Sequence, residues 1–287
     1  MHCKWGLFMI KLTADSTCDL SKEILDAYEI DLIPVHIVLD EKVYSDNVDI
    51  TPRDIFRFVE EEDKTCRTAA INVYEYHRFL EPLSKKYDSV LHISLGSGFS
   101  SCYQNARLAA EGLENVYVID SANLSSGSGY LVYRLAKAIN DGSNIEDLLK
   151  LAHNIIPKIN GSFVIDKLDY LYKGGRCSNL ELVGTKVLKI KPCIEVFNGQ
   201  MRVGSKCRGS FERCVKNYIS DRLVDVDQID QDIIFITNAD SDQNLMDHVV
   251  NRIKDEYDFK EIVINKAGCT ISAHCGPDTI GIFFLER

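Results

Sequence analysis

Along the first half of the chain, short apolar runs alternate with polar turns and helix-like stretches. The strand-like runs are residues 9–14, 31–39, 90–95 and 116–120. The expected helices are residues 21–28, 74–87, a stretch ending near 112 and a stretch ending near 140. Continuous apolar strands that alternate with helices are typical of a parallel sheet that is buried on both faces. We therefore predict an α/β domain with a mainly parallel sheet flanked by helices.

The pattern changes after about residue 161. Further strand-like runs are residues 162–166, 191–197, 201–206, 233–238, 261–266 and 279–285, and the expected helices are 211–222 and 243–256. Asn198-Gly199 is typical of a tight turn between antiparallel strands. We predict a second α/β domain with a mixed sheet, and we place the two domains at residues 1–160 and 161–287.

The charge of the chain narrows the class of ligand. The formal net charge is −10, and no block of lysine or arginine is present. Nucleic acids and anionic membranes require a basic face, so neither is an expected partner. An anionic small molecule would have to be held by hydrogen-bond donors within its own site, because the overall charge of the chain does not attract it. No apolar run approaches the ~20 residues of a membrane span.

The start of the chain and the cysteines suggest a cytoplasmic protein. Residues 1–8 lack the apolar core and cleavage site of a signal peptide, and Met9 is an alternative start. The ten cysteines form no C-x-x-C pair, which disfavours zinc and is typical of reduced thiols used as small apolar residues. Asp15 and Asp19 could hold magnesium, but helix capping requires fewer assumptions, and we predict no metal.

The most informative segment is the turn at residues 96–101, where a strand ends and a helix begins. Unpaired backbone N–H groups and the helix dipole at such a position favour an anion. Ser97, Ser100 and Ser101 add hydroxyl donors. The turn lacks the lysine of a Walker loop and the third glycine of a dinucleotide-binding loop. The alternative is that these serines cap the helix.

Three further residues could contribute to an anion site. Thr68 precedes a helix. Arg176 follows paired glycines, and its guanidinium group could bind a carboxylate or phosphate. His274, expected in a turn at 273–277, could bind an oxyanion or act as a base. Each has a structural alternative: a loop-shaping threonine, a surface arginine beside a helix end, and a structural histidine.

Seven segments, in this order, together resemble the DegV family, and the resemblance extends from about residue 10 to 286. They are ADSTCDL (14–20), RTA (67–69), ISLGSGFSSCYQ (93–104), VIDS (118–121), LDYLYKGGR (168–176), KIKP (189–192) and HCGP (274–277). The resemblance implies two α/β domains with one long-chain fatty acid, such as palmitate, stearate or oleate, in a buried tunnel between them. It assigns carboxyl binding to Thr68, Ser100, Arg176 and His274, and we add Ser97 for its hydroxyl.

The resemblance also implies a role. Members are non-catalytic carriers that present the bound carboxylate to the catalytic subunit of a bacterial fatty acid kinase, which forms an acyl phosphate for phospholipid synthesis. The resemblance implies no cofactor, and we expect any contact with a membrane to be transient. Two departures concern the ligand: Ala69 stands where a serine is common, and Ser101-Cys102 stands where Gly-Thr is usual.

Physical arguments agree with a carrier. Burial of a sixteen-carbon chain gains roughly 0.8 kcal/mol per methylene, on the order of 10 kcal/mol before entropy losses. An unpaired buried carboxylate would cancel several kcal/mol of that gain, so donors are needed at one end.

Two other functions remain open. A serine hydrolase would use Ser100 or Ser97 with His274 as the base, although the G-x-S-x-G nucleophile elbow is missing. A nucleotide enzyme would use the parallel sheet, but the glycine fingerprint and its partner carboxylate are missing.

Overall fold

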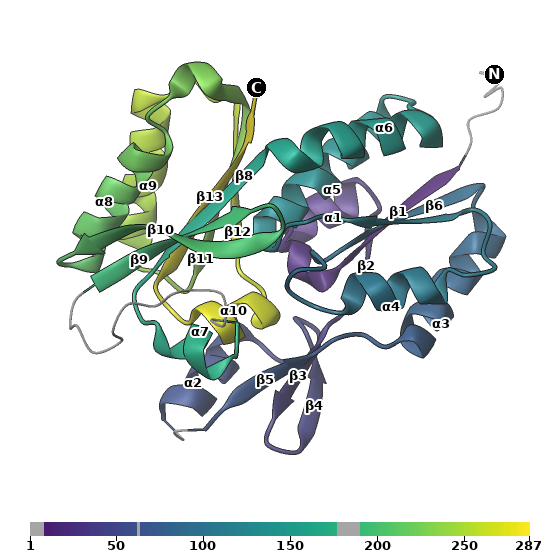
Figure 1. Cartoon of the computed structure of the whole chain (residues 1–287), viewed down its shortest axis with the longest axis horizontal. Coiled ribbons are helices and arrows are strands. Elements are labelled where there is room, and N and C mark those ends of the chain that lie inside the picture. Colours follow the sequence, from purple (N-terminus) through teal and green to yellow (C-terminus); the bar gives the residue numbers. More distant parts are fainter. Residues whose placement is uncertain (1–8, 62–63, 177–189) are drawn as a thin grey trace.

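The computed structural model describes residues 9–61, 64–176 and 190–287, which contain three sheets (Figure 1). The first sheet has the order β2-β1-β6-β7, and all its neighbouring strands are parallel. Its strands are β1 (Ile10–Asp15), β2 (Asp31–Ile33), β6 (Ser89–Ser94) and β7 (Val116–Asp120). The predicted parallel sheet in the first half is confirmed.

Helices surround this sheet, and one of them is shared with the rest of the molecule. They are α1 (Lys22–Ala27), α3 (Val73–Lys86), α4 (Cys102–Ala109), α5 (Ser125–Asn140) and α6 (Ile145–Ile155). Helix α5 lies between the parallel sheet and the larger sheet, and it contacts β1 and β6 as well as β8, β11 and β13. Because both sheets pack on it, Tyr130 and Leu131 are fully buried. The sequence pattern did not identify α6, which begins at the Asn144 cap.

The larger sheet has the order β10-β9-β8-β13-β11-β12. Its strands are β8 (Ile159–Ile165), β9 (Ile190–Phe197), β10 (Gln200–Arg208), β11 (Ile229–Ala239), β12 (Glu261–Lys266) and β13 (Thr279–Glu286). The β11–β12 pair is parallel and the other pairs are antiparallel. Asn198 and Gly199 have φ of 49° and 71°, as a two-residue hairpin turn requires. The predicted mixed sheet and hairpin are confirmed.

Side chains alternate across the larger sheet because successive residues of a strand point to opposite faces. Ile234 and Ile236 pack against α8 (Phe211–Arg222) and α9 (Gln243–Glu256), whereas Phe235 between them packs against α5. The strands of this sheet begin at residue 159, and the predicted domain boundary at 160 stays a prediction.

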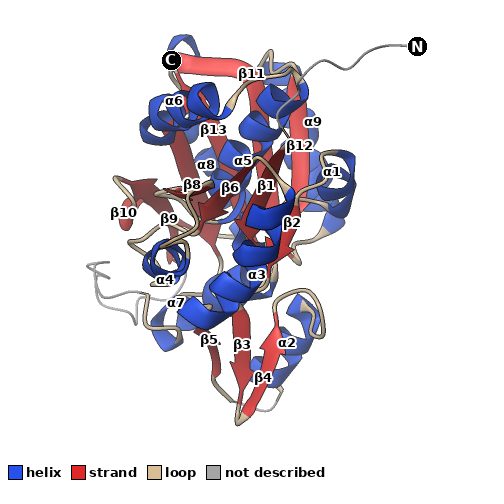
Figure 2. Cartoon of the chain, turned by 90° about the vertical axis from the view of Figure 1, so that its right-hand side faces the viewer, coloured by secondary structure: helices blue, strands red, loops and turns tan. Residues whose placement is uncertain are grey.

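A third, antiparallel sheet corrects the prediction of one strand over 31–39. Pro34 lacks an N–H group and restricts the residue before it, so the strand ends at Ile33. The chain then enters a separate sheet with the order β4-β3-β5. Its strands are β3 (His36–Leu39), β4 (Lys42–Ser45) and β5 (Cys66–Ala69), with helix α2 (Pro52–Glu60) beside them. Figure 2 shows this group at one end of the molecule.

The remaining elements are short. They are helices α7 (Asp169–Lys173) and α10 (Cys269–Cys275) and the 3₁₀ turns Ser16–Cys18, Ile156–Lys158 and Val226–Gln228. Within the described ranges, no helix is both long enough and apolar enough to cross a membrane. Residues 1–8, on which the expectation about a leader rests, lie outside the described residues, as do Cys177 and Lys189.

Asp15 ends β1 and joins it to two other elements. Its carboxylate accepts hydrogen bonds from the Tyr76 hydroxyl of α3 at 2.6 Å and from Ser94 Oγ at 2.8 Å. It also accepts from Leu95 N at 2.7 Å and from His92 Nε2 at 3.2 Å. A buried carboxylate needs such donors.

The capping role considered for Asp15 is not observed, because its side chain makes no cap hydrogen bond. Ser21, rather than Asp15, caps helix α1, because Ser21 Oγ accepts the N–H of Ile24. Across the part of the chain that the structure describes, no group of three or more histidine, cysteine, aspartate or glutamate side chains could hold a metal ion.

Replacement of Tyr76 by phenylalanine tests the Asp15 network. Tyr76→Phe leaves the buried carboxylate one donor short, so we expect the free energy of unfolding to fall by about 1–3 kcal/mol. Urea titration measures this change. The control is Tyr74→Phe in the same helix, where the side chain is 68% exposed, and an equal loss in both variants would contradict the assigned role.

Candidate functional site

Two predicted site residues meet in a direct hydrogen bond. Thr68 Oγ1, near the end of β5, lies 2.9 Å from His274 Nε2. The two residues are 206 positions apart in the sequence. The predicted turn at 273–277 is wrong for its first part, because Cys269–Cys275 form helix α10 and the chain turns only at Gly276. His274 is therefore held on a helix rather than in a loop.

The surroundings of His274 keep its ring neutral. Loss of hydration and, second, the nearby charge of Arg176 lower the pKa of His274 to about 3. Its Nδ1 atom is shielded from solvent and has no hydrogen-bond partner among the described residues. A Cβ atom at Gly174 would lie 2.3 Å from Nδ1, so only glycine lets the chain pass this close to the ring.

Ser100 and Arg176 line the same hollow as Thr68 and His274. Ser100 Oγ accepts the N–H of Cys102 and donates to Cys102 Sγ, both at 3.2 Å. Arg176 follows α7 and donates to the carbonyl of Gly174 at 2.9 Å. The structure thus brings four of the five predicted residues to one place.

Ser97 differs from these four residues. It is exposed, its backbone N–H donates to Asp120 Oδ1 at 3.0 Å, and it does not line the hollow. The glycine after it allows close packing, since a Cβ atom at Gly98 would lie 2.0 Å from the carbonyl oxygen of Gly199. The serine-rich turn therefore lies directly against the tip of the β9–β10 hairpin.

The hollow has a polar end, formed by Thr68, Ser100, Arg176 and His274, and the rest of its wall is mainly apolar. Its apolar lining includes Leu95, Leu124, Phe163, Leu171, Met201 and Ile271. A second hollow shares Leu124, Phe163, Ile271 and Cys275 with the first and reaches Ala239 and Phe283. The second hollow therefore adjoins the first, and it contains none of the four residues of the polar end.

Both hollows are narrow in this structure. Their volumes are about 60 Å³ and about 20 Å³, compared with roughly 300–1,000 Å³ for ordinary small-molecule pockets. A long ligand would fit only if the walls moved apart.

Two buried carboxylates, Asp19 and Asp46, hold the start of α10 beside the hollow. Asp46 accepts hydrogen bonds from Cys269 N at 2.8 Å and Thr270 Oγ1 at 2.7 Å. Asp19 accepts from Gly268 N at 2.9 Å. Thr270 itself lines the hollow. Asp46 and Thr270 could not be predicted from the sequence, because no local pattern indicates that residues so far apart meet.

The same two carboxylates also contact the N-terminal half of the chain. Asp46 accepts from Ser16 Oγ at 2.9 Å, and Asp19 accepts from Ser125 Oγ at 2.6 Å. Burial raises the pKa of Asp19 to about 8, against the lowering effect of Ser125 and Gly268. Burial also raises the pKa of Asp46. The sequence pattern offers Asp19 only as a magnesium ligand together with Asp15; in the structure Asp19 joins distant segments.

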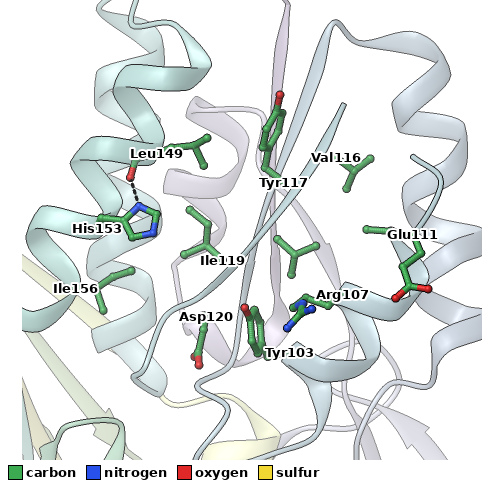
Figure 3. A pocket seen from close by; sticks show the side chains of 12 residues that line it. Tyr103, Arg107, Glu111, Val116, Tyr117, Ile119, Asp120, Leu149, His153 and Ile156 are labelled. Carbon is green, nitrogen blue, oxygen red and sulfur yellow. Dashed lines mark hydrogen bonds between the residues drawn. The ribbon is translucent and has the colours of Figure 1, made fainter. Parts of the chain in front are cut away.

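A much larger hollow, about 610 Å³, lies elsewhere, along the edge strand β7 between α4 and α6 (Figure 3). Tyr103 and Arg107 of α4 and His153 of α6 line it, and His153 Nδ1 is bonded to the Leu149 carbonyl at 2.7 Å. It contains none of the five predicted residues and is an open surface groove. The small hollow with convergent polar groups is the better candidate for a ligand with an apolar body.

The chain matches a family model over residues 9–287, described as an uncharacterised protein of the DegV family. A DegV domain-containing protein of Clostridium perfringens is 32% identical over 286 residues, covering 97% of this chain and 99% of that protein. A DegV domain-containing protein of Caldanaerobacter subterraneus is 30% identical over 282 residues, with the same coverage.

Solved structures are similar over nearly the whole chain. A DegV family protein from Thermus thermophilus, described as fatty acid binding, has a TM-score of 0.87 at 23% identity and covers 97% of this chain and 100% of its own. A DegV lipid-binding protein from Thermotoga maritima has a TM-score of 0.85 at 25% identity and covers 97% and 98%. The family model, the relatives and the shared two-domain α/β fold show that this chain belongs to the DegV family.

Proposed function

We propose that this chain binds one long-chain fatty acid and presents its carboxylate to the catalytic subunit of a fatty acid kinase. The carboxylate would lie at Thr68, Ser100, Arg176 and His274, and the acyl chain would follow the two hollows. The observation that carries this proposal is the Thr68–His274 hydrogen bond at one end of a mainly apolar hollow that Ser100 and Arg176 also line.

The names of similar structures support the ligand class. The Thermus thermophilus protein is described as fatty acid binding, and a protein from Eubacterium ventriosum, with a TM-score of 0.84, as binding stearic acid. The Streptococcus pneumoniae fatty acid kinase (Fak) B3 protein, with a TM-score of 0.83, was solved with linoleic acid. That last name supports a kinase as the partner.

The chemistry of the polar end suits a carboxylate. Arg176 supplies the positive charge, and hydroxyls supply uncharged donors, which together offset the cost of removing a carboxylate from water. His274 has a lowered pKa, so its neutral ring can donate one N–H without adding a second charge. Arg176 is exposed, whereas Leu124 and Phe163 are buried, so the head group would lie nearer the surface than the tail.

A head group that lies near the surface also fits a carrier that does no chemistry itself. The kinase would supply the phosphoryl-transfer machinery, and this chain would need no cofactor or metal of its own. We propose that it works in the cytoplasm and meets membranes transiently.

The serine hydrolase alternative is disfavoured by the hydrogen bonds. His274 Nε2 bonds to Thr68 rather than to Ser100, and Ser100 Oγ is engaged with Cys102. No carboxylate in the described residues is bonded to His274 Nδ1. A serine nucleophile would need that histidine as its base and an acid behind it.

An organic extract of the purified protein tests the function directly. We expect mass spectrometry to find one fatty acid per chain, because burial of the acyl chain in an apolar site is favourable. Adding ATP and a fatty acid kinase catalytic subunit should then convert the bound acid to an acyl phosphate, trapped as a hydroxamate. Protein that holds no lipid and takes up no fatty acid would refute the proposal, whereas lipid binding without acyl phosphate would refute the kinase partner alone.

Alanine variants test the head-group residues. Thr68→Ala and Ser100→Ala each remove a hydroxyl donor to a charged group, worth about 1.5–3 kcal/mol, so we expect affinity for a fatty acid to fall about tenfold or more. Fluorescent fatty-acid displacement measures it. Thr68→Ser should restore most of the affinity.

Matched controls for these variants are Thr65→Ala and Ser101→Ala, because both side chains are exposed and Ser101 makes no cap hydrogen bond. Unchanged affinity in both test variants would show that the carboxylate lies elsewhere.

The direction of the acyl chain is tested at the far end of the second hollow. Ala239 lines it and is 2% exposed, so Ala239→Leu should fill the space that the end of a long chain needs. We expect weaker binding of an eighteen-carbon acid and unchanged binding of a ten-carbon acid, compared by displacement at a temperature where both proteins are folded. Equal weakening of both acids would place the tail outside this hollow.

A further inference from the structure

A polar hollow of about 220 Å³ lies on the opposite face of the larger sheet from the proposed fatty-acid site. It is lined by Val164, which packs on the α8 side, whereas the preceding Phe163 lines the candidate site. The hollow lies between β9, the end of β10 and the start of α8. Three cysteines line it: Cys193, Cys207 and Cys214.

Two of these thiols belong to neighbouring elements that line the same hollow. They are Cys207, near the end of β10, and Cys214, in the first turn of α8. Cys207 Sγ accepts from Asn217 Nδ2 at 3.7 Å. Asn217 is three residues after Cys214 and therefore on the same face of the helix. This contact places Cys207 over that face of α8.

The two thiols differ in exposure. Cys207 is half-exposed, so a small molecule in the hollow can reach it. Cys214 is buried; this burial and, second, the interaction with Cys207 raise the pKa of Cys214 to about 12. An accessible thiol beside a buried second thiol is the arrangement of an attacking and a resolving cysteine.

The charges around the hollow contrast with the rest of the protein. The chain has a net charge of −10, yet the charged residues that line the hollow are four cationic and one anionic: Lys191, Lys206, Arg208, Arg213 and Asp221. Positive charge near a sulfur stabilises the negative charge that it carries when it reacts as a nucleophile.

We propose that Cys207 and Cys214 form a reversible disulfide when Cys207 reacts with a hydroperoxide. The Cys207 sulfur attacks the terminal peroxide oxygen, the O–O bond breaks, and an alcohol leaves with the thiol proton. Cys207 is then a sulfenic acid. The Cys214 sulfur attacks the Cys207 sulfur, the S–O bond breaks, and water leaves with the second proton. Two thiols lose two electrons in total, and one hydroperoxide is reduced.

The two thiols face one hollow from neighbouring elements, because Cys207 Sγ accepts from Asn217 of the helix that carries Cys214. A disulfide of ~2.05 Å would require β10 and the start of α8 to move locally toward each other. The product would join the end of β10 to the first turn of α8. The site does not include any residue of the proposed fatty-acid site, so the two proposals stand or fall separately.

Oxidation of the intact protein tests the proposal. After one equivalent of hydrogen peroxide and alkylation of the remaining thiols, we expect a peptide mass that joins Cys207 to Cys214 with loss of two hydrogens, and dithiothreitol should restore both thiols. Alkylation of both residues after oxidation, or a disulfide between either one and another cysteine, would overturn the proposal.

Variants separate the roles of the two thiols. In Cys214→Ser, Cys207 should be trapped by dimedone as a sulfenic acid at least tenfold more than in the wild type, because the resolving thiol is missing. Cys193→Ala, in the same hollow, should leave the disulfide unchanged. Failure to trap Cys207, or loss of the disulfide in Cys193→Ala, would contradict the assigned roles.

Discussion

The structure depends on buried carboxylates that join segments far apart in the sequence. Asp19 and Asp46 accept hydrogen bonds from the first residues of α10, and each also binds a hydroxyl from the first half of the chain. A buried carboxyl group without such partners would destabilise the fold by several kcal/mol, so these hydrogen bonds hold the start of α10 against the first half of the chain. The position of α10, and therefore of His274 at its other end, follows from this constraint.

The candidate site is one result of that constraint. Thr68 comes from the small third sheet and His274 from α10, and the two residues meet only because α10 is fixed beside that sheet. Gly174 then lets the α7 turn pack against the histidine ring and bring Arg176 to the rim. Thr68, His274 and Arg176 thus reach the polar end from three separate segments of the chain.

Much of the fold could be predicted from sequence, because hydrophobic periodicity is a local property. The limits of α9 and β12 agree with the pattern, and Asn198-Gly199 forms the expected hairpin turn. The third sheet could not be predicted in this way. Pro34 divides one apolar run between two sheets, and nothing local indicates that β3 pairs with β5.

The candidate site, like the fold, could be predicted from sequence only in part. Motif resemblance identified Thr68, Ser100, Arg176 and His274, which line one hollow. Ser97 belongs to the same motif but lies outside the hollow, because neighbouring residues of a turn point in different directions. Asp46 and Thr270 were missed, since their roles arise only from contact between distant segments.

The position of α5 has a consequence for how the whole molecule unfolds. Its side chains belong to a single core that includes Leu91 and Ile93 of the parallel sheet together with Phe235 and Phe283 of the larger one. Separation of the two halves would therefore expose part of this shared core. Despite its two-domain architecture, the chain should behave as one cooperative unit, in which loss of either half removes the shared helix from the other.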